Sequence, residues 1–237
     1  MKKIFTILII FFVLSFVHAQ KKGKTSNANV IMDKVVQVFE AVNDFSVSVE
    51  AEIKMERVQI PKMNAKFYFK KPNKIHFSSQ GFLLVPREGV VPNPSYLREH
   101  YDAAFIEEDI IEGKKFYKLQ LAAKDIKTRL RQLYIWIDGA NWTIVKTETI
   151  PYEGRTLTML FTYQLQQDKY WLPSKVVVNF GSTIETENSS VDSTNQGGNQ
   201  LGQLQRGMPR TGSISINYSD YKINYGIDDS IFEGKKK

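Results

Sequence analysis

The feature that constrains this sequence most is a strict alternation of apolar and polar side chains over residues 45–55. Apolar residues occupy the odd positions and polar residues the even positions, from Phe45 to Met55 without exception. Successive side chains of a β-strand point to opposite faces of a sheet, so this period of two predicts a strand with one dry face and one wet face. The dry face must be buried against another part of the protein.

Shorter runs of the same kind recur along the chain, and residues that favour turns separate them. The turns are marked by Lys71-Pro72-Asn73, Glu112-Gly113-Lys114, Asp138-Gly139 and Gln167-Asp168-Lys169, because these residue types suit turn geometry and proline cannot donate to a ladder. About ten strands at hairpin spacing, with one convincing helix, predict an antiparallel sheet that curls on itself.

One helix and two irregular segments complete this outline. Apolar residues recur at helical spacing through residues 31–42, which predicts an amphipathic helix. Residues 85–104 contain three prolines and a helical turn through residues 96–101. Residues 182–212 are rich in Ser, Thr, Asn, Gln and Gly, and this stretch is too long for an ordinary connection, so we expect a flexible loop there.

The first residues have the pattern of an export signal. Lys2 and Lys3 precede an apolar run over residues 4–17, and Ala19 supplies the small residue that cleavage requires. A membrane anchor is the alternative, but this run is shorter than the ~20 residues that a spanning helix needs. We therefore expect a signal peptide over residues 1–19, a flexible arm over 20–28, and a single domain over 29–237.

The composition excludes several kinds of chemistry. The chain has no cysteine, which rules out disulfides, thiolate metal sites and a cysteine nucleophile. The formal net charge is +7, but acidic residues are interleaved with the basic ones, which favours a solubility role over nucleic-acid binding. The acidic cluster Glu107, Glu108, Asp109 and Glu112 is better explained as a solvated hairpin than as an acid–base pair. We expect no catalytic residues, no metal, no cofactor and no nucleic-acid partner.

The dry face of the curled sheet is the candidate binding surface. Either its own side chains fill the interior, or an apolar cavity remains that suits acyl chains, since each buried CH₂ contributes roughly 0.8 kcal/mol. A lid would have to open such a cavity, and the helix over residues 31–42 and the segment over residues 86–104 are the movable candidates. The apolar positions expected to line the cavity are Val47, Val49, Ile53, Phe67, Phe69, Phe77, Leu119, Leu133, Ile135, Met159, Phe161, Val176 and Val178.

Two stretches carry a family resemblance. Residues 44–54 (DFSVSVEAEIK) and 65–77 (AKFYFKKPNKIHF) resemble the periplasmic outer-membrane lipoprotein carrier, or LolA-like, superfamily, and residues 133–138, 145–148, 172–176, 218–224 and 228–232 are similar to its broader lipoprotein-sorting relatives. The resemblance implies a half-open antiparallel β-barrel of about ten or eleven strands with lid helices (α+β).

The same resemblance implies a function and a location. It implies a periplasmic, non-catalytic carrier or chaperone that binds lipid or lipoprotein acyl chains, with inner- and outer-membrane proteins as partners, and we expect a monomer. The superfamily also covers regulators that bind a membrane protein, so an envelope-stress sensor is the alternative. A pull-down that recovers a protein partner, with little lipid transfer, would favour this alternative.

Lys71 is where the sequence departs from the family pattern. An arginine in the equivalent turn of the carriers helps to hold the lid shut, and the resemblance places Lys71 at that position. Lysine offers a point charge and no planar fork, so a bidentate latch on lid carbonyls would be weaker. Two roles therefore stay open for Lys71, a lid latch and a solvated turn residue. The Trp-containing strand expected soon after the Pro-Asn turn is also missing, and the proline-rich segment stands in its place.

Overall fold

A computed structural model describes residues 27–55, 58–78, 91–125, 127–128, 130–149, 155–182 and 212–233. The expected signal peptide, most of the arm and nearly all of the expected loop at 182–212 lie outside the described residues. So do residues 86–90 of the expected lid segment.

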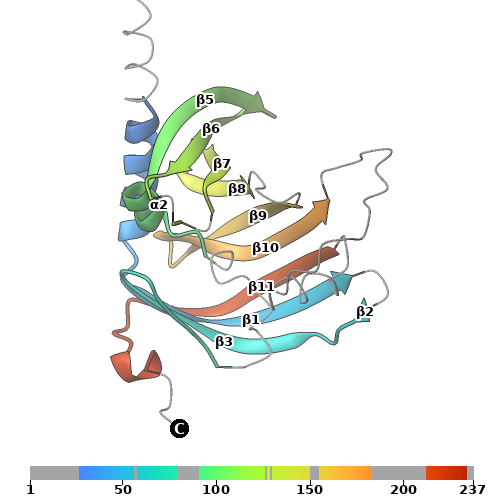
Figure 1. The fold of residues 1–237 in the computed structure, drawn as a ribbon. Coiled ribbons are helices and arrows are strands. Elements are labelled where there is room, and N and C mark those ends of the chain that lie inside the picture. Colours follow the sequence, from blue (N-terminus) through green and yellow to red (C-terminus); the bar gives the residue numbers. More distant parts are fainter. Residues whose placement is uncertain are drawn as a thin grey trace, which may run out of the picture.

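Eleven strands form one sheet in which every pair of neighbours is antiparallel. The order is β4-β3-β1-β11-β10-β9-β8-β7-β6-β5, with β2 paired to β1 beside this path. The sheet curves strongly, and its two end strands are not paired with each other (Figure 1). This architecture confirms the predicted mainly β, half-open barrel. The strands are β1 (Asp44–Met55), β2 (Val58–Gln59), β3 (Met63–Lys70), β4 (Lys74–Phe77), β5 (Tyr101–Ile111), β6 (Lys114–Ala123), β7 (Gln132–Asp138), β8 (Thr143–Thr149), β9 (Arg155–Gln166), β10 (Tyr170–Ser182) and β11 (Gly212–Ile223).

Two helices lie together at one side of the sheet (Figure 1). The N-terminal helix covers residues 27–40, and α2 covers Pro94–His100. Residues 27 and 28 were expected in the flexible arm, and this boundary is wrong, because Ala28 is helical and fully buried in the core. The expected lid segment also ends too late, since its last residues, 101–104, belong to β5.

The buried side chains form two apolar clusters, one at each end of the sheet. The lower cluster contains residues of β1, β3, β9, β10 and β11. The upper cluster contains residues of β5, β6, β7 and β8 together with the first turns of the N-terminal helix. The helix contributes to both, because Met32 and Val35 belong to the upper cluster while Phe39 packs on the lower one.

The junction between the helix and β1 is fastened by the end of β11. The Asn224 side chain accepts a hydrogen bond from the Asn43 amide at 2.6 Å and donates to the Ala41 carbonyl at 3.0 Å. The buried Asp44 carboxylate accepts from the amides of Tyr225 and Gly226, each at 3.1 Å. Asparagine tolerates the positive φ of 53° at position 224 better than most residues. The junction is therefore held by residues at the far end of the sequence.

Gly212 shows how closely β10 and β11 approach one another. A Cβ at this position would lie 2.6 Å from the Phe180 ring and 3.0 Å from the Lys54 carbonyl oxygen. We expect Gly212→Ala to destabilise the protein by about 1–3 kcal/mol, because the ring and the backbone must move apart. Gly181→Ala is the matched control, since no atom of the described residues, other than those of its chain neighbours, lies within 4 Å of its Cβ position. Urea denaturation of both variants measures the difference in their free energies of unfolding. Equal stabilities would contradict this close packing.

A candidate apolar binding site beneath two helices

The predicted lining residues lie on the inner face of the curled sheet, but in two separate groups. Nine of them are buried in the lower cluster and three in the upper one. Phe77 is only half-buried and packs against the edge of the lower cluster. The lower group contains Val47, Val49, Ile53, Phe67, Phe69, Met159, Phe161, Val176 and Val178, and the upper group contains Leu119, Leu133 and Ile135.

The boundary between the two groups lies between β8 and β9. In the described ranges these two strands share three register pairs, from Lys146–Leu160 to Glu148–Thr158. Farther along, the Tyr163 hydroxyl donates a hydrogen bond to the Ile144 carbonyl at 3.0 Å, so a side chain joins the two strands where no register pair does. Burial raises the pKa of Tyr163 well above its ordinary value, which keeps this hydroxyl protonated as a donor.

A small apolar cavity lies at this seam, under both helices. Its volume is about 30 Å³, which is roughly the space of one water molecule. An acyl chain therefore fits only if the covering elements move. The lining comes from the N-terminal helix, the segment before α2 and its first residue, the turn before β8, and strands β8, β9 and β10, namely Val35, Val38, Phe39, Val91, Pro92, Pro94, Trp142, Thr143, Ile144, Tyr163, Trp171, Leu172 and Pro173.

Lys71 ties the end of the N-terminal helix to the turn between β3 and β4. Its ammonium group donates to the Glu40 carbonyl oxygen and to the Glu40 carboxylate, each at 2.6 Å. One lysine thus reaches two acceptors of the same residue, which a point charge can do without the planar fork of arginine. Lys71 lies where a latch would act, and its role in holding a lid stays a prediction.

The second helix is fastened to the same place. Asn93 caps α2 by accepting from the Tyr96 amide at 3.0 Å, and its side-chain nitrogen donates to the Pro72 carbonyl at 2.9 Å. Ser95 donates to the Glu40 carboxylate at 2.6 Å. The Lys71–Glu40–Ser95 network therefore joins the rim of the sheet to both helices through polar contacts at the surface.

Glu40 makes this network sensitive to acid. Hydrogen bonds from Lys71 and then from Ser95 lower the pKa of Glu40 below its ordinary 4.5. A carboxyl group whose pKa is lowered by folding stabilises the protein above its unfolded pKa and loses that contribution as the pH falls through its folded pKa.

We expect Glu40→Gln to be less stable than the parent by about 0–1 kcal/mol at pH 7, because the pair is partly exposed. The difference should shrink as the pH falls below 4.5 and should vanish once the pH is below the lowered pKa of Glu40 in the folded protein, where the parent carboxyl is protonated. Urea denaturation of both proteins across this range tests the expectation. A stability difference that stays constant with pH would show that the Glu40 charge does not stabilise the folded protein.

Several residues at the seam carried no clear signal in the sequence. Trp142 has a positive φ of 56° at the turn between β7 and β8, where a bulky residue is unusual. Its ring stacks on Tyr117 at 5.6 Å, and the Lys34 ammonium of the N-terminal helix lies 4.1 Å from its centroid. Because Trp142 follows the turn residues Asp138-Gly139, the sequence indicates that it lies near a turn. Only the fold shows that its ring faces the N-terminal helix.

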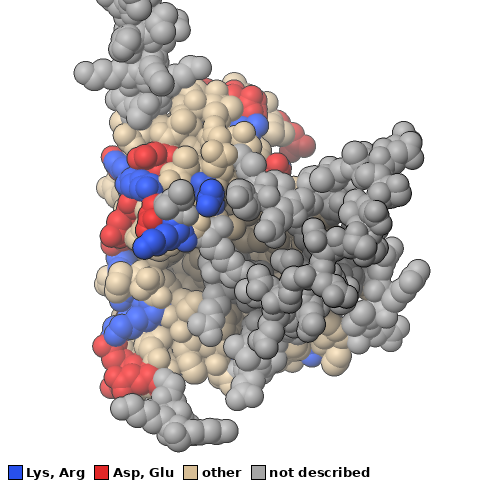
Figure 2. Space-filling model, viewed as in Figure 1, with Lys and Arg blue, Asp and Glu red and all other residues tan. Residues whose placement is uncertain are grey.

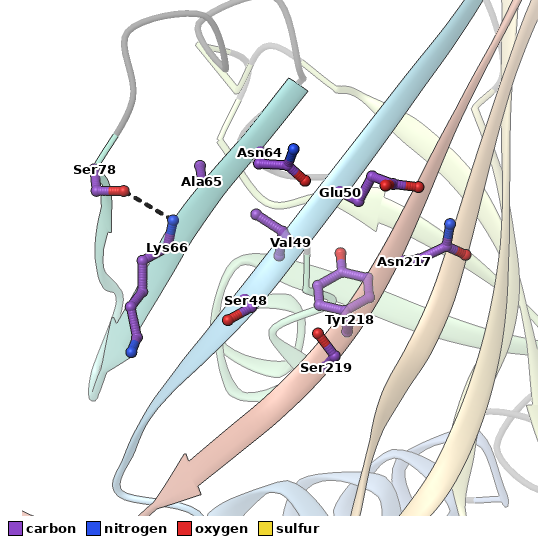
Figure 3. A pocket seen from close by; sticks show the side chains of 10 residues that line it. All are labelled: Ser48, Val49, Glu50, Asn64, Ala65, Lys66, Ser78, Asn217, Tyr218 and Ser219. Atoms are coloured by element: carbon purple, nitrogen blue, oxygen red, sulfur yellow. Dashed lines mark hydrogen bonds between the residues drawn. The ribbon is translucent and has the colours of Figure 1, made fainter. Parts of the chain in front are cut away.

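A second hollow lies on the opposite, wet face of the sheet. It has a volume of about 590 Å³ and is shown in Figure 3. Side chains of β1, β3 and β11 that alternate with the buried ones line it, including Ser48, Glu50, Lys66 and Asn217. Val49, Ala65 and Tyr218 also contribute to its lining, and it shares no residue with the seam cavity, so it does not extend the apolar site. In the described part of the chain, no group of three potential metal ligands comes together.

A curled antiparallel sheet with helices at one side and an apolar inner face defines the class of this molecule, which has the LolA-type fold. A LolA superfamily protein from Nitrosomonas europaea matches with a TM-score of 0.56 and 13% identity, over 86% of this chain and 96% of that one. A domain described as a putative outer membrane lipoprotein-sorting protein, from Vibrio parahaemolyticus, matches with a TM-score of 0.56 and 13% identity, over 88% and 97%. A DUF1329 family protein from Desulfovibrio piger matches with a TM-score of 0.58 and 12% identity, over 89% and 98%.

Sequence comparisons add little to this assignment. A family model described as "Uncharacterized protein" matches residues 94–195. The curated proteins include no match.

None of the helices in the described ranges is both long enough and apolar enough to cross a membrane.

Proposed function

We propose that this protein is an exported, periplasmic carrier that binds the acyl chains of a lipid or lipoprotein without catalysing a reaction. The observation that carries the proposal is the seam cavity, which lies between two apolar clusters beneath helices held by a polar latch. The structural likeness to LolA-type proteins supports it, because it gives the same curled sheet and helical cover.

In this proposal the latch controls access. Loss of the Lys71–Glu40 and Ser95–Glu40 contacts frees α2 and the helix to move away from the seam. An acyl chain can then enter beside Trp142 and Trp171, at the end of β8 where the described residues of β8 and β9 form no register pair. The chain would gain from leaving water, while membrane proteins on either side would supply and accept the cargo.

The three tryptophans of the chain allow a positional test with a brominated fatty acid, whose bromine quenches nearby indole fluorescence. Trp142 and Trp171 line the seam. Trp136 lies on the wet face between Lys118 and Lys146. Single-tryptophan variants, with the other two replaced by phenylalanine, should therefore show quenching for Trp142 and Trp171 but not for Trp136.

Two further measurements complete the test. Native mass spectrometry after mild extraction should show a lipid bound to the protein. Phe69→Leu should stay within ~1.5 kcal/mol of the parent in stability, while it changes the affinity for the brominated fatty acid. Equal quenching of all three tryptophans, or no quenching with no bound lipid, would count decisively against a carrier.

A further inference from the structure

β5 is the last strand of the sheet, and one of its edges is open. It pairs with β6 on one side, and the described strands provide no second neighbour. β5 has 11 residues, so the open edge is about 37 Å long at ~3.4 Å per residue. The strand at the opposite end, β4, has only four residues. A long unpaired edge offers a row of amide and carbonyl groups to an added strand, which most proteins avoid.

The second half of β5 also exposes large apolar side chains. Ile110 is 70% exposed, Ile111 is 57% exposed and Ile106 is 38% exposed. These are three of the eight exposed large apolar residues in the described ranges, and they fall within six positions. The first half of the same strand is different, because Tyr101 and Ala103 are buried in the upper cluster. The exposure thus begins where the strand runs past the core.

Acidic residues surround these isoleucines. Glu107 pairs with Lys118 at 2.8 Å and Glu108 pairs with Lys115 at 2.7 Å, and both lysines lie on the inner neighbour, β6. Among the described residues no ion pair engages Asp109 or Glu112. Figure 2 shows acidic side chains gathered at this end of the molecule. In the described part of the chain, the carboxylates that lack an ion pair at this end of β5 are therefore those of Asp109 and Glu112, which lie beside the exposed isoleucines.

The alternation of the strand fixes how these groups are presented. Glu108 and Ile110 share one face of the sheet, and Asp109 and Ile111 share the other. Each face of the edge therefore carries an isoleucine and at least one carboxylate, because Glu107 lies on the same face as Asp109. The complement is an extended segment with two consecutive basic residues beside two consecutive apolar residues. A second copy of this chain is a poor complement, because antiparallel pairing would place carboxylates opposite one another.

We propose that the open edge of β5 is a docking site for a partner protein, which adds a strand containing an adjacent basic pair and an apolar pair. Main-chain hydrogen bonds to the edge supply affinity, and side-chain contacts with the acids and isoleucines supply specificity. The site lies on a different strand from the seam, so it can hold a partner while the apolar site is closed or loaded.

The test uses the fluorescein-labelled peptide Ser-Lys-Lys-Val-Val-Thr and measures fluorescence anisotropy with the full mature protein. The acidic peptide Ser-Glu-Glu-Val-Val-Thr is the control ligand. We expect saturable binding of the basic peptide only, and slower amide hydrogen exchange at residues 106–111 when it is bound.

Point variants locate the contact. Ile111→Ser and Asp109→Lys should each weaken binding by about fivefold or more. Leu165→Ser is the matched control, since Leu165 is 39% exposed on β9, away from the edge, and should leave binding unchanged. Circular dichroism confirms folding, and the fatty-acid quenching of all three variants should match the parent.

Three results would overturn the proposal. They are equal binding of both peptides, no saturation up to about 1 mM, and exchange protection confined to other strands. Self-association abolished by Ile111→Ser would also overturn it, because the occupant would then be a second copy of the chain.

Discussion

Phe45→Ala is expected to lower the free energy of unfolding by about 3–5 kcal/mol, the largest effect of a single substitution that we predict for this protein. Phe45 is fully buried at the start of β1. Its ring lies 5.3 Å from Phe69, 5.8 Å from Phe67 and 5.5 Å from Tyr221, measured between centroids. Removing it leaves a cavity between three strands of the lower cluster and removes these ring contacts.

Urea denaturation with linear extrapolation measures this loss. Tyr225→Ala is the control, because that side chain is 48% exposed and its removal should change stability by no more than about 0.5 kcal/mol. A loss below 1 kcal/mol for Phe45→Ala would mean that the lower cluster rearranges to fill the space. The face would then be more plastic than its tight aromatic packing indicates.

Covalent closure of the cover is expected to abolish acyl-chain uptake, with a drop of at least about tenfold in its rate. The chain has no cysteine, so Glu40→Cys/Ser95→Cys provides a single pair for a short bismaleimide linker. The parent side chains are 2.6 Å apart, which places both thiols within reach of the linker. The reason for the loss is steric, because a cavity of about 30 Å³ cannot accept a hydrocarbon chain while α2 stays against the helix.

The controls for this experiment come from the same variant. Before cross-linking, the double variant should take up a brominated fatty acid at least as fast as the parent, because the contacts of the Glu40 carboxylate with Lys71 and Ser95 are gone, while the Lys71 contact with the Glu40 carbonyl can remain. Protein loaded first and cross-linked afterwards should retain its ligand. Unchanged uptake after complete cross-linking would show that the cover between Glu40 and Ser95 is not the gate.

The strands could be predicted from the sequence wherever one face of the strand is buried in the core and the other is exposed to solvent. The alternation over residues 45–55 predicted β1 almost to the residue, because a one-residue slip would turn the apolar side chains toward water. The predicted fold class is confirmed by the sheet order and by the structural neighbours. The helix was found from its spacing, but its start was set too late, since Ala28 is one small residue with no periodic neighbour before it.

Other features depend on contacts between distant residues, and the sequence offers no local pattern for them. The place of β1 between β3 and β11 is one example, because pairing partners far apart in the chain leave no trace in local periodicity. The seam is another, since Trp142, Tyr163 and Trp171 come from three elements that meet only in the folded sheet. Lys71 was singled out by resemblance, and the structure adds Glu40 and Ser95 as its network.

The pairing of β1 with β11 has a consequence for how the molecule is made. A chain that leaves the ribosome N-terminus first presents β1 early, but one of the two edges of β1 stays empty until the last strand has been delivered. Asn224, which fastens the start of β1, is 181 positions away from Asn43. Such long-range closure slows folding. Under the export proposed above, this delay would keep the chain unfolded until translocation is complete.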